Sequence, residues 1–126
     1  MKIYGVGTDI VNIERLKKSL KNKAFLNRLF CEEEKSKCNK LINSNSCYAK
    51  RFTAKEAFSK ALGTGISNGI KFNQIVVTND KKGKPFIKLQ GKTMLIVKKK
   101  FKRKPKIALS LSDEKNFAVA FVTISI

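Results

Sequence analysis

The stretch from Arg51 to Gly65 constrains the fold most, because its pattern predicts a helix with one well-defined buried face. Small and apolar side chains recur there at spacings of three and four residues: Ala54, Ala57, Phe58, Ala61 and Leu62. Glu56 and Lys60 lie one turn apart on the opposite side of this helix. Gly63 and Gly65 then end the helix and allow close approach to the backbone. An ordinary surface helix with a solvated Glu-Lys pair fits the same pattern.

A second unusual residue is Asp9, which interrupts the apolar strand predicted over Ile3 to Ile13. A carboxylate inside a strand is unfavourable unless it is paired or binds a cation. The alternative is that Asp9 caps the structure that follows the strand. Asn12 can cap the next helix, which is predicted to run to Leu20.

The remaining elements alternate in a way that defines the fold class. Helices are predicted over residues 24–30, 31–41, about 47–62 and 92–101, with a loop at the N-S-N-S run from Asn43. Strands are predicted over residues 72–78, 86–89, 107–111 and 117–126, the first two forming a hairpin. This order predicts one α+β domain over residues 1–126, with a mainly antiparallel sheet and a long central helix. The last strand is apolar on both faces, which predicts burial on both sides.

The formal net charge of +19 on 126 residues limits the choice of partners. Nucleic acid, an anionic membrane, and an acidic protein or ligand all fit this charge. The strongest basic run, Lys98 to Lys106, favours nucleic acid, yet no recognised binding motif accompanies it and aromatic residues are not interleaved with it. A high content of Lys, Asn and Ile also fits a codon bias, which weakens the argument from charge.

The three cysteines are Cys31, Cys38 and Cys47, and the chain has no histidine. No zinc-ligand spacing or disulfide framework is visible, so we expect reduced thiols in a cytosol. No apolar run is long enough for a membrane span, and the N-terminus resembles a strand rather than a signal peptide.

Two isolated acids, Asp9 and Glu56, suggest a magnesium site. Two carboxylates combined with water and substrate phosphates are a typical Mg²⁺ ligand set. Lys60 and the backbone N–H groups of residues 63–65 would hold phosphate oxygens. Sequence spacing does not show that the two acids meet in space, so separate structural roles for them stay open.

Four motifs resemble those of one enzyme family. They are G-V-G-T-D-I-V-N-I-E-R at residues 5–15, R-F-T-A-K-E-A-F-S-K-A-L-G-T-G-I at 51–66, G-K-P at 83–85 and S-L-S-D-E at 110–114. They are similar to the signatures of bacterial holo-[acyl-carrier-protein] synthases, the small class of 4′-phosphopantetheinyl transferases. The resemblance runs from Met1 to the C-terminus without a large insertion. Two long motifs in the right order make a chance match improbable.

The resemblance implies a reaction in fatty acid biosynthesis. Coenzyme A would donate its phosphopantetheine arm to a serine of apo acyl carrier protein, with Mg²⁺ as cofactor and adenosine 3′,5′-bisphosphate as the other product. It also implies a cytoplasmic homotrimer whose sites are shared between subunits. An acidic carrier suits this basic chain, and we expect neither nucleic acid nor a membrane as partner. A carrier protein itself would be acidic and would contain an Asp-Ser-Leu attachment motif, which this chain lacks.

The resemblance also assigns roles to individual residues. Asp9 and Glu56 match the family's metal-binding acids, and Lys60 lies where the family has a lysine against the phosphates. Because the serine proton needs an acceptor, we expect Glu56 to take it, directly or through a metal-bound water, so Glu56 and Lys60 are the predicted catalytic residues. The residues that match the family's coenzyme site are Arg51, Lys60, Gly63, Thr64 and Gly65. Arg15 lies where the family grips its carrier, and we expect Arg28 on the next helix to face the carrier too.

One position departs from the family pattern. The third motif usually reads Ser-x-Ser/Thr-His, and Asp113 stands at the histidine. A carboxylate there would repel the coenzyme's phosphates unless it turns away or joins the metal ligands. Asp113 is therefore left out of the predicted catalytic residues.

Overall fold

The computed structural model describes residues 1–65 and 69–126. Its helices are α1 (Ile13–Leu20), α2 (Lys23–Leu29), α3 (Glu32–Asn39), α4 (Ser44–Leu62) and α5 (Gly91–Phe101), with a short 3₁₀ turn, η1 (Phe72–Gln74). Its strands are β1 (Ile3–Asn12), β2 (Ile75–Asn79), β3 (Pro85–Leu89), β4 (Lys106–Asp113) and β5 (Phe117–Ser125). The predicted α+β class and the antiparallel pairing are confirmed, with the strands divided between two sheets.

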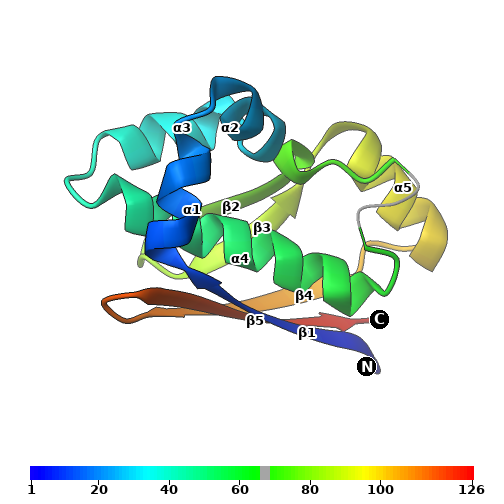
Figure 1. Ribbon diagram of the computed structural model, residues 1–126. Coiled ribbons are helices and arrows are strands. Elements are labelled where there is room, and N and C mark those ends of the chain that lie inside the picture. Colours follow the sequence, from blue (N-terminus) through cyan, green and yellow to red (C-terminus); the bar gives the residue numbers. More distant parts are fainter. Residues whose placement is uncertain (66–68) are drawn as a thin grey trace.

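The larger sheet is three-stranded, in the order β1-β5-β4, and the hairpin β2-β3 forms the second sheet. β5 is central, so Asp9 on β1 lies opposite Ala120 and Asp113 on β4 lies opposite Ala118. Figure 1 shows α4 lying across one face of this sheet, with α1, α2 and α3 beyond it. Asp9 and Asp113 therefore lie on opposite sides of β5, on the face of the sheet that α4 covers.

Two glycines bring β1 and α4 into backbone contact. A Cβ on Gly5 would lie 2.0 Å from the carbonyl oxygen of Ala61, and one on Gly7 would lie 1.9 Å from that of Ala57. No side chain fits such a gap. The predicted apolar stripe of α4 is confirmed, because all five of its residues are at most 3% exposed.

The other side of α4 is also largely buried, which the amphipathic pattern did not predict. Lys55 is fully buried and its ammonium donates to Glu34 Oε1 at 2.7 Å and to the carbonyl oxygens of Phe72 and Ile75. Glu34 in turn accepts from the backbone N–H of Val77 at 3.0 Å. Burial lowers the pKa of Lys55, and the charge of Glu34 opposes that shift. This satisfied ion pair fixes α4 to α3 and to β2, and removing one partner would cost about 3–5 kcal/mol.

No helix among the described residues covers the outer face of the three-stranded sheet (Figure 1), where several large apolar side chains are exposed. Alternate residues of β5 from Ala118 to Ile124 are buried against α4, whereas Phe117 and Phe121 are 43% and 47% exposed. On β1, Val6 and Ile10 are 55% and 63% exposed. The chain's own helices therefore cover only one face of β5.

Three local expectations were wrong. The N-S-N-S run is not a loop but the first turn of α4, because Ser46 is held by Asp113 of β4, and this tertiary contact overrides the turn preference of Ser and Asn. The stretch at 72–74 is a 3₁₀ turn, and its strand begins at Ile75. Cys38 and Cys47 form a disulfide between α3 and α4 rather than staying reduced, and Cys31 is the free cysteine among the described residues.

Candidate active site

The structure brings Asp9 of β1 and Glu56 of α4 together, as the magnesium hypothesis requires. Burial raises the pKa of Glu56, the negative charge of Asp9 raises it further, and Lys60 opposes both effects. Asp9 accepts hydrogen bonds from Thr53 Oγ1 at 2.8 Å and from Lys60, both on α4. It does not cap α1, because Asn12 performs that task through a 3.0 Å bond from the N–H of Arg15.

Lys60 completes this cluster. Its Nζ lies 3.3 Å from Asp9 Oδ1 and 3.0 Å from the carbonyl oxygen of Thr8. The side chain is 57% exposed, so it is solvated as the ordinary-helix alternative has it, but its hydrogen bonds go to β1. An ammonium has three N–H donors, and these two contacts leave one for an anionic ligand.

The residues present fit a hard divalent cation. The described residues contain no group of three His, Cys, Asp or Glu side chains that could hold a metal, so protein alone does not complete a ligand set. Two carboxylates with open positions suit Mg²⁺, which keeps water and phosphate ligands. Burial and, after it, the negative charge of Asp9 raise the pKa of Glu56, and a cation between the two carboxylates would offset both effects.

The glycine turn directly follows α4, three residues after Lys60, and its glycines face open space. Gly63 and Gly65 have φ values of +84° and +62°, which other residues rarely adopt. A Cβ on either would meet nothing within 4 Å, so here backbone conformation and not close packing requires glycine. The Oγ1 of Thr64 lies 3.4 Å from the carbonyl oxygen of Gly65. Ile66, the last residue of the matched motif, lies outside the described residues.

Arg51 lies away from the two acids. Five residues separate it from Glu56, about 140° around the helix, so the two side chains leave α4 in different directions. Arg51 is 5% exposed at the wall of a groove of about 730 Å³, lined by the α3–α4 junction, the β2-β3 hairpin and the end of β4. Gly83 and Pro85 of the G-K-P motif line the same groove. The predicted site residues thus form two groups in one chain: the acids Asp9 and Glu56 with Lys60, and Arg51 at the groove.

This groove is strongly basic, with one acid on its wall. Its charged lining residues are Lys37, Lys40, Lys50, Arg51 and Asp113. Asp113 Oδ2 accepts a 3.0 Å bond from Ser46 Oγ, and its Oδ1 lies 3.7 Å from Lys50 Nζ. The Asp113 carboxylate is therefore bound by its neighbours, which reduces its repulsion of an anion in the groove.

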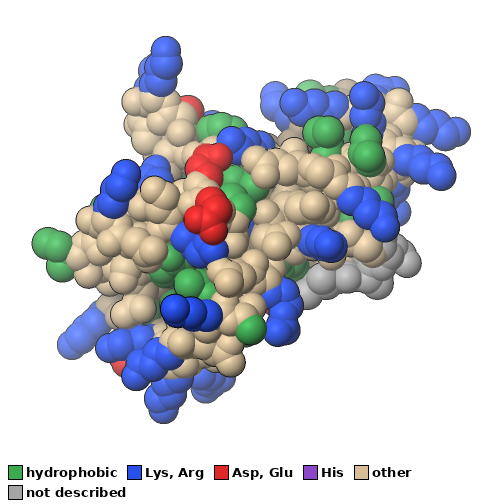
Figure 2. Space-filling model, turned by 90° about the horizontal axis from the view of Figure 1, so that it is seen from above, with side chains coloured by type: hydrophobic (Ala, Val, Ile, Leu, Met, Phe, Trp, Pro, Cys, Tyr) green, Lys and Arg blue, Asp and Glu red, His purple; other side chains and the backbone are tan. Residues whose placement is uncertain are grey.

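The two predicted carrier-binding arginines lie on neighbouring exposed helices. Arg15 is on α1 and Arg28 on α2, and both are exposed. Arg28 also lines a smaller hollow of about 350 Å³ together with Leu29 and Phe72. Figure 2, a view from above, shows many Lys and Arg side chains around the rim of the molecule and few acidic ones. The surface suits an acidic protein.

Two site residues escaped the sequence reasoning although their spacing could have revealed them. Thr53 lies three residues before Glu56 and therefore on the same face of α4, where it holds Asp9. Cys47 lies four residues before Arg51, and both its carbonyl oxygen and its sulfur accept from that guanidinium. By contrast, no local signal joins Ser46 to Asp113, because the two are 67 residues apart.

Known proteins resemble this chain along nearly its whole length. A holo-[acyl-carrier-protein] synthase from Pelagibacter ubique is 49% identical over 125 residues, covering 98% of both chains. The crystal structure of such a synthase from Neisseria meningitidis is 36% identical with a TM-score of 0.88, covering 98% of this chain and 99% of that one. A synthase from Bacillus anthracis in complex with CoA (3′,5′-ADP) is 35% identical with a TM-score of 0.81, covering 98% and 97%.

The family model agrees with these relatives. It is described as the 4′-phosphopantetheinyl transferase superfamily and matches residues 5–122. Those residues include most of β1 with Asp9, the whole of α4 and most of β5, so the match covers both groups of site residues. The chain belongs to the 4′-phosphopantetheinyl transferase superfamily.

Proposed function

We propose that this protein transfers 4′-phosphopantetheine from coenzyme A to a serine of apo acyl carrier protein, releasing adenosine 3′,5′-bisphosphate. The observation that carries this proposal is the meeting of Asp9, Glu56 and Lys60 within a chain 49% identical to a holo-[acyl-carrier-protein] synthase. Two acids and a lysine suit phosphoryl chemistry, which depends on alignment and charge neutralisation.

Asp9 and Glu56 would hold Mg²⁺, which supplies positive charge at the pyrophosphate. Lys60 binds a phosphate oxygen through its remaining N–H donor. Glu56 accepts the serine proton, either directly or through a metal-bound water. Thr53 keeps Asp9 turned toward α4. The Gly63-Thr64-Gly65 turn supplies backbone N–H groups to the coenzyme.

The basic groove around Arg51 would receive the nucleotide end of coenzyme A. Four cations and one bound carboxylate line it, so it attracts an anion. The Bacillus anthracis relative, described as a complex with CoA (3′,5′-ADP), supports a nucleotide ligand. Arg51 would contact that ligand from the groove wall.

The acyl carrier protein would bind at Arg15 and Arg28. Carriers of this kind are acidic, and a net charge of +19 would speed their encounter with the enzyme. These exposed charges would mainly steer and orient the partner, because solvent screens each of them.

The separation of the two groups supports a homotrimer with shared sites. The acids lie beside β1 and the nucleotide groove beside β4, on different sides of α4, so neighbouring subunits could each supply one group to a shared site. The uncovered apolar face, with Phe117, Phe121, Val6 and Ile10, gives the subunits a surface to bury. A closed ring would join the groove of one subunit to the acids of the next.

We place this activity in the cytoplasm and in fatty acid biosynthesis, because coenzyme A and acyl carrier protein are used there, and we treat residues 1–126 as one catalytic domain. No helix among the described residues is long and apolar enough to cross a membrane. The disulfide stands out in such a location, since disulfides in reducing compartments are usually catalytic or redox-sensing.

The test is incubation of the purified protein with apo carrier, coenzyme A and Mg²⁺, followed by intact mass measurement of the carrier. We expect the carrier to gain the mass of one phosphopantetheine group. An unchanged mass, with folded enzyme and a carrier that a known synthase modifies, would falsify the proposal. Omitting Mg²⁺ and adding a chelator should abolish the gain.

A further inference from the structure

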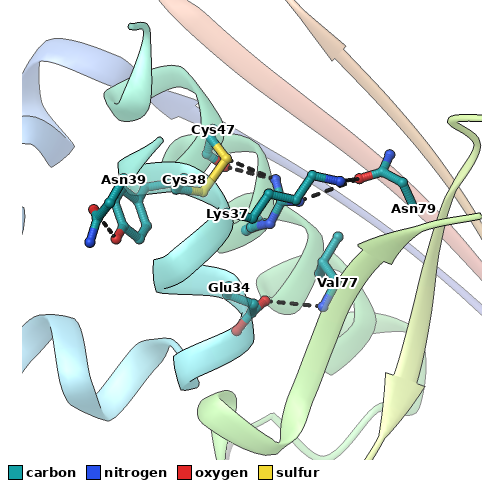
Figure 3. Close-up of a disulfide and its surroundings, with 9 residues drawn as sticks. Glu34, Lys37, Cys38, Asn39, Cys47, Val77 and Asn79 are labelled. Carbon is teal, nitrogen blue, oxygen red and sulfur yellow. Dashed lines mark hydrogen bonds between the residues drawn. A yellow bond between two sulfur atoms is a disulfide. The ribbon is translucent and has the colours of Figure 1, made fainter. Parts of the chain in front are cut away.

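The disulfide lies at the wall of the basic groove and not in a remote part of the core. Cys38 is at the end of α3 and Cys47 is in the first turns of α4, and Figure 3 shows the bond joining the two helices. Cys47 lines the groove beside Arg51. A change at this bond therefore occurs next to a residue proposed to contact the coenzyme.

Cys47 also supplies most of the contacts that hold Arg51. The Nη1 of Arg51 lies 3.1 Å from Cys47 Sγ and 3.4 Å from the Cys47 carbonyl oxygen. The Nη2 donates to Asn79 Oδ1 at 3.4 Å, and Nε has no hydrogen-bond partner among the described residues. The guanidinium is thus nearly buried yet held by few, long contacts.

The first turn of α4 is tied to β4 by the bond from Ser46 to Asp113, whereas few contacts besides the disulfide tie it to α3. Asn43 stands at the N-cap without a side-chain capping bond, and the N–H of Cys47 reaches the Asn43 carbonyl at 3.3 Å. Helix ends without caps fray readily. Besides the disulfide, a 2.7 Å bond from Tyr48 Oη to Asn39 Oδ1 ties this turn to α3. Closing the disulfide therefore restrains the turn that carries the acceptors of Arg51.

We propose that the Cys38–Cys47 disulfide is a positioning element for Arg51, so that its reduction weakens binding of the coenzyme's nucleotide end. The proposal rests on the proposed function, because it takes Arg51 as a coenzyme contact. In the closed state the crosslink holds Cys47 Sγ and its carbonyl oxygen against the guanidinium. In the open state the turn moves more freely and Arg51 loses its fixed place at the groove wall.

The chemistry is a thiol–disulfide exchange with a dithiol as co-reactant. The dithiol gives two electrons and two protons to the S–S bond and becomes a cyclic disulfide, while Cys38 and Cys47 become thiols. The reverse exchange with an oxidised dithiol closes the bond again. Cys47 lines the groove and is 4% exposed, whereas Cys38 is fully buried, so a dithiol would reach the pair from the Cys47 side.

Binding of adenosine 3′,5′-bisphosphate, measured by calorimetry on oxidised and dithiol-reduced protein, tests this directly. That product lacks the thiol of coenzyme A, which would itself attack the disulfide. We expect the dissociation constant to rise about tenfold on reduction, the effect of losing one charged hydrogen bond. Thiol counting by mass after alkylation verifies the state, with one free thiol before reduction and three after it.

Three variants separate positioning from a general loss of structure. Cys38→Ala should bind weakly with or without the dithiol, and Cys31→Ser, the matched control, should behave as wild type. Arg51→Met should bind weakly in both states and show no further effect of reduction. Circular dichroism checks that each variant is folded.

Equal affinity in the two verified states, or a redox effect that persists in Arg51→Met, overturns the positioning role. So does a count of three thiols after exposure to an oxidised dithiol. If oxidised and reduced protein bind adenosine 3′,5′-bisphosphate equally and both modify the carrier, only this inference fails and the proposed function stands. Absence of modification in both states overturns the proposed function and this inference with it.

Discussion

The Lys60 ammonium lies 3.3 Å from Asp9 Oδ1, so the last turns of α4 and the middle of β1 are joined by a charged contact at the surface. Asp9 is 16% exposed at its side chain and Lys60 is 57% exposed. The ammonium thus offsets part of the charge of the two acids while it still faces solvent. A ligand phosphate that arrives there meets a cation already held in place.

Replacing Lys60 by Met should raise the KM for coenzyme A and slow transfer by about ten- to a hundredfold, because a charged contact to the phosphates is lost. The fold should survive, since the side chain is largely exposed. Steady-state rates at saturating carrier measure both constants. Lys99→Met, an exposed lysine on α5, is the matched control and should leave both unchanged.

Glu56→Gln should abolish most turnover and yet raise the melting temperature at neutral pH. The pKa of Glu56 is raised in the folded state, so the fold favours the protonated form. Its stabilising contribution is present below the unfolded-state pKa and is lost as the pH rises through the folded-state pKa. The charged carboxylate therefore opposes folding at pH 7, and an uncharged amide does not. Thermal unfolding at several pH values should show the advantage of the variant shrinking in acid.

The same melting experiment with added Mg²⁺ checks the metal assignment. Mg²⁺ should raise the melting temperature of the wild type and have little effect on Glu56→Gln or Asp9→Ala. If both variants respond to Mg²⁺ as the wild type does, the ion binds elsewhere.

Reversing the charge at Arg15 should raise the carrier KM about tenfold or more and leave the coenzyme KM nearly intact. It should also flatten the dependence of carrier KM on salt, because an attractive charge pair is removed. Initial rates at several salt concentrations measure this for Arg15→Glu beside Lys99→Glu, which changes the net charge equally. An equal rise in the KM for coenzyme A and the KM for the carrier would show that Arg15 does not act on the carrier alone.

A shared site predicts that two inactive variants restore each other when co-expressed. Asp9→Ala damages the acidic group and Arg51→Met the groove, and a site built from intact halves of two subunits would work. With random mixing, about a quarter of the sites should be intact. The matched control pairs Asp9→Ala with Glu56→Gln, whose defects lie in the same group, and should stay inactive. Light scattering that gave a mass near 14.2 kDa would contradict the trimer.

The sequence was sufficient for the features that repeat along the chain. Three- and four-residue spacing correctly predicted the buried stripe from Ala54 to Leu62, and the Asn12 cap and the hairpin followed from local preferences. It was insufficient where distant segments meet. The Cys38–Cys47 bond and the Ser46–Asp113 contact depend on how α3, α4 and β4 pack, and no local periodicity encodes that packing.

The backbone contact at Gly5 and Gly7 sets the distance between the strand and the helix that carry the proposed metal site. The strand that carries Asp9 lies against the helix that carries Glu56 because two methyl groups are missing, and the carbonyl oxygens of Ala57 and Ala61 fill their places. An alanine at position 7 would act as a wedge and force strand and helix apart, although it would touch neither acid. The spacing between the carboxylates of Asp9 and Glu56 thus depends on two residues that have no side chain.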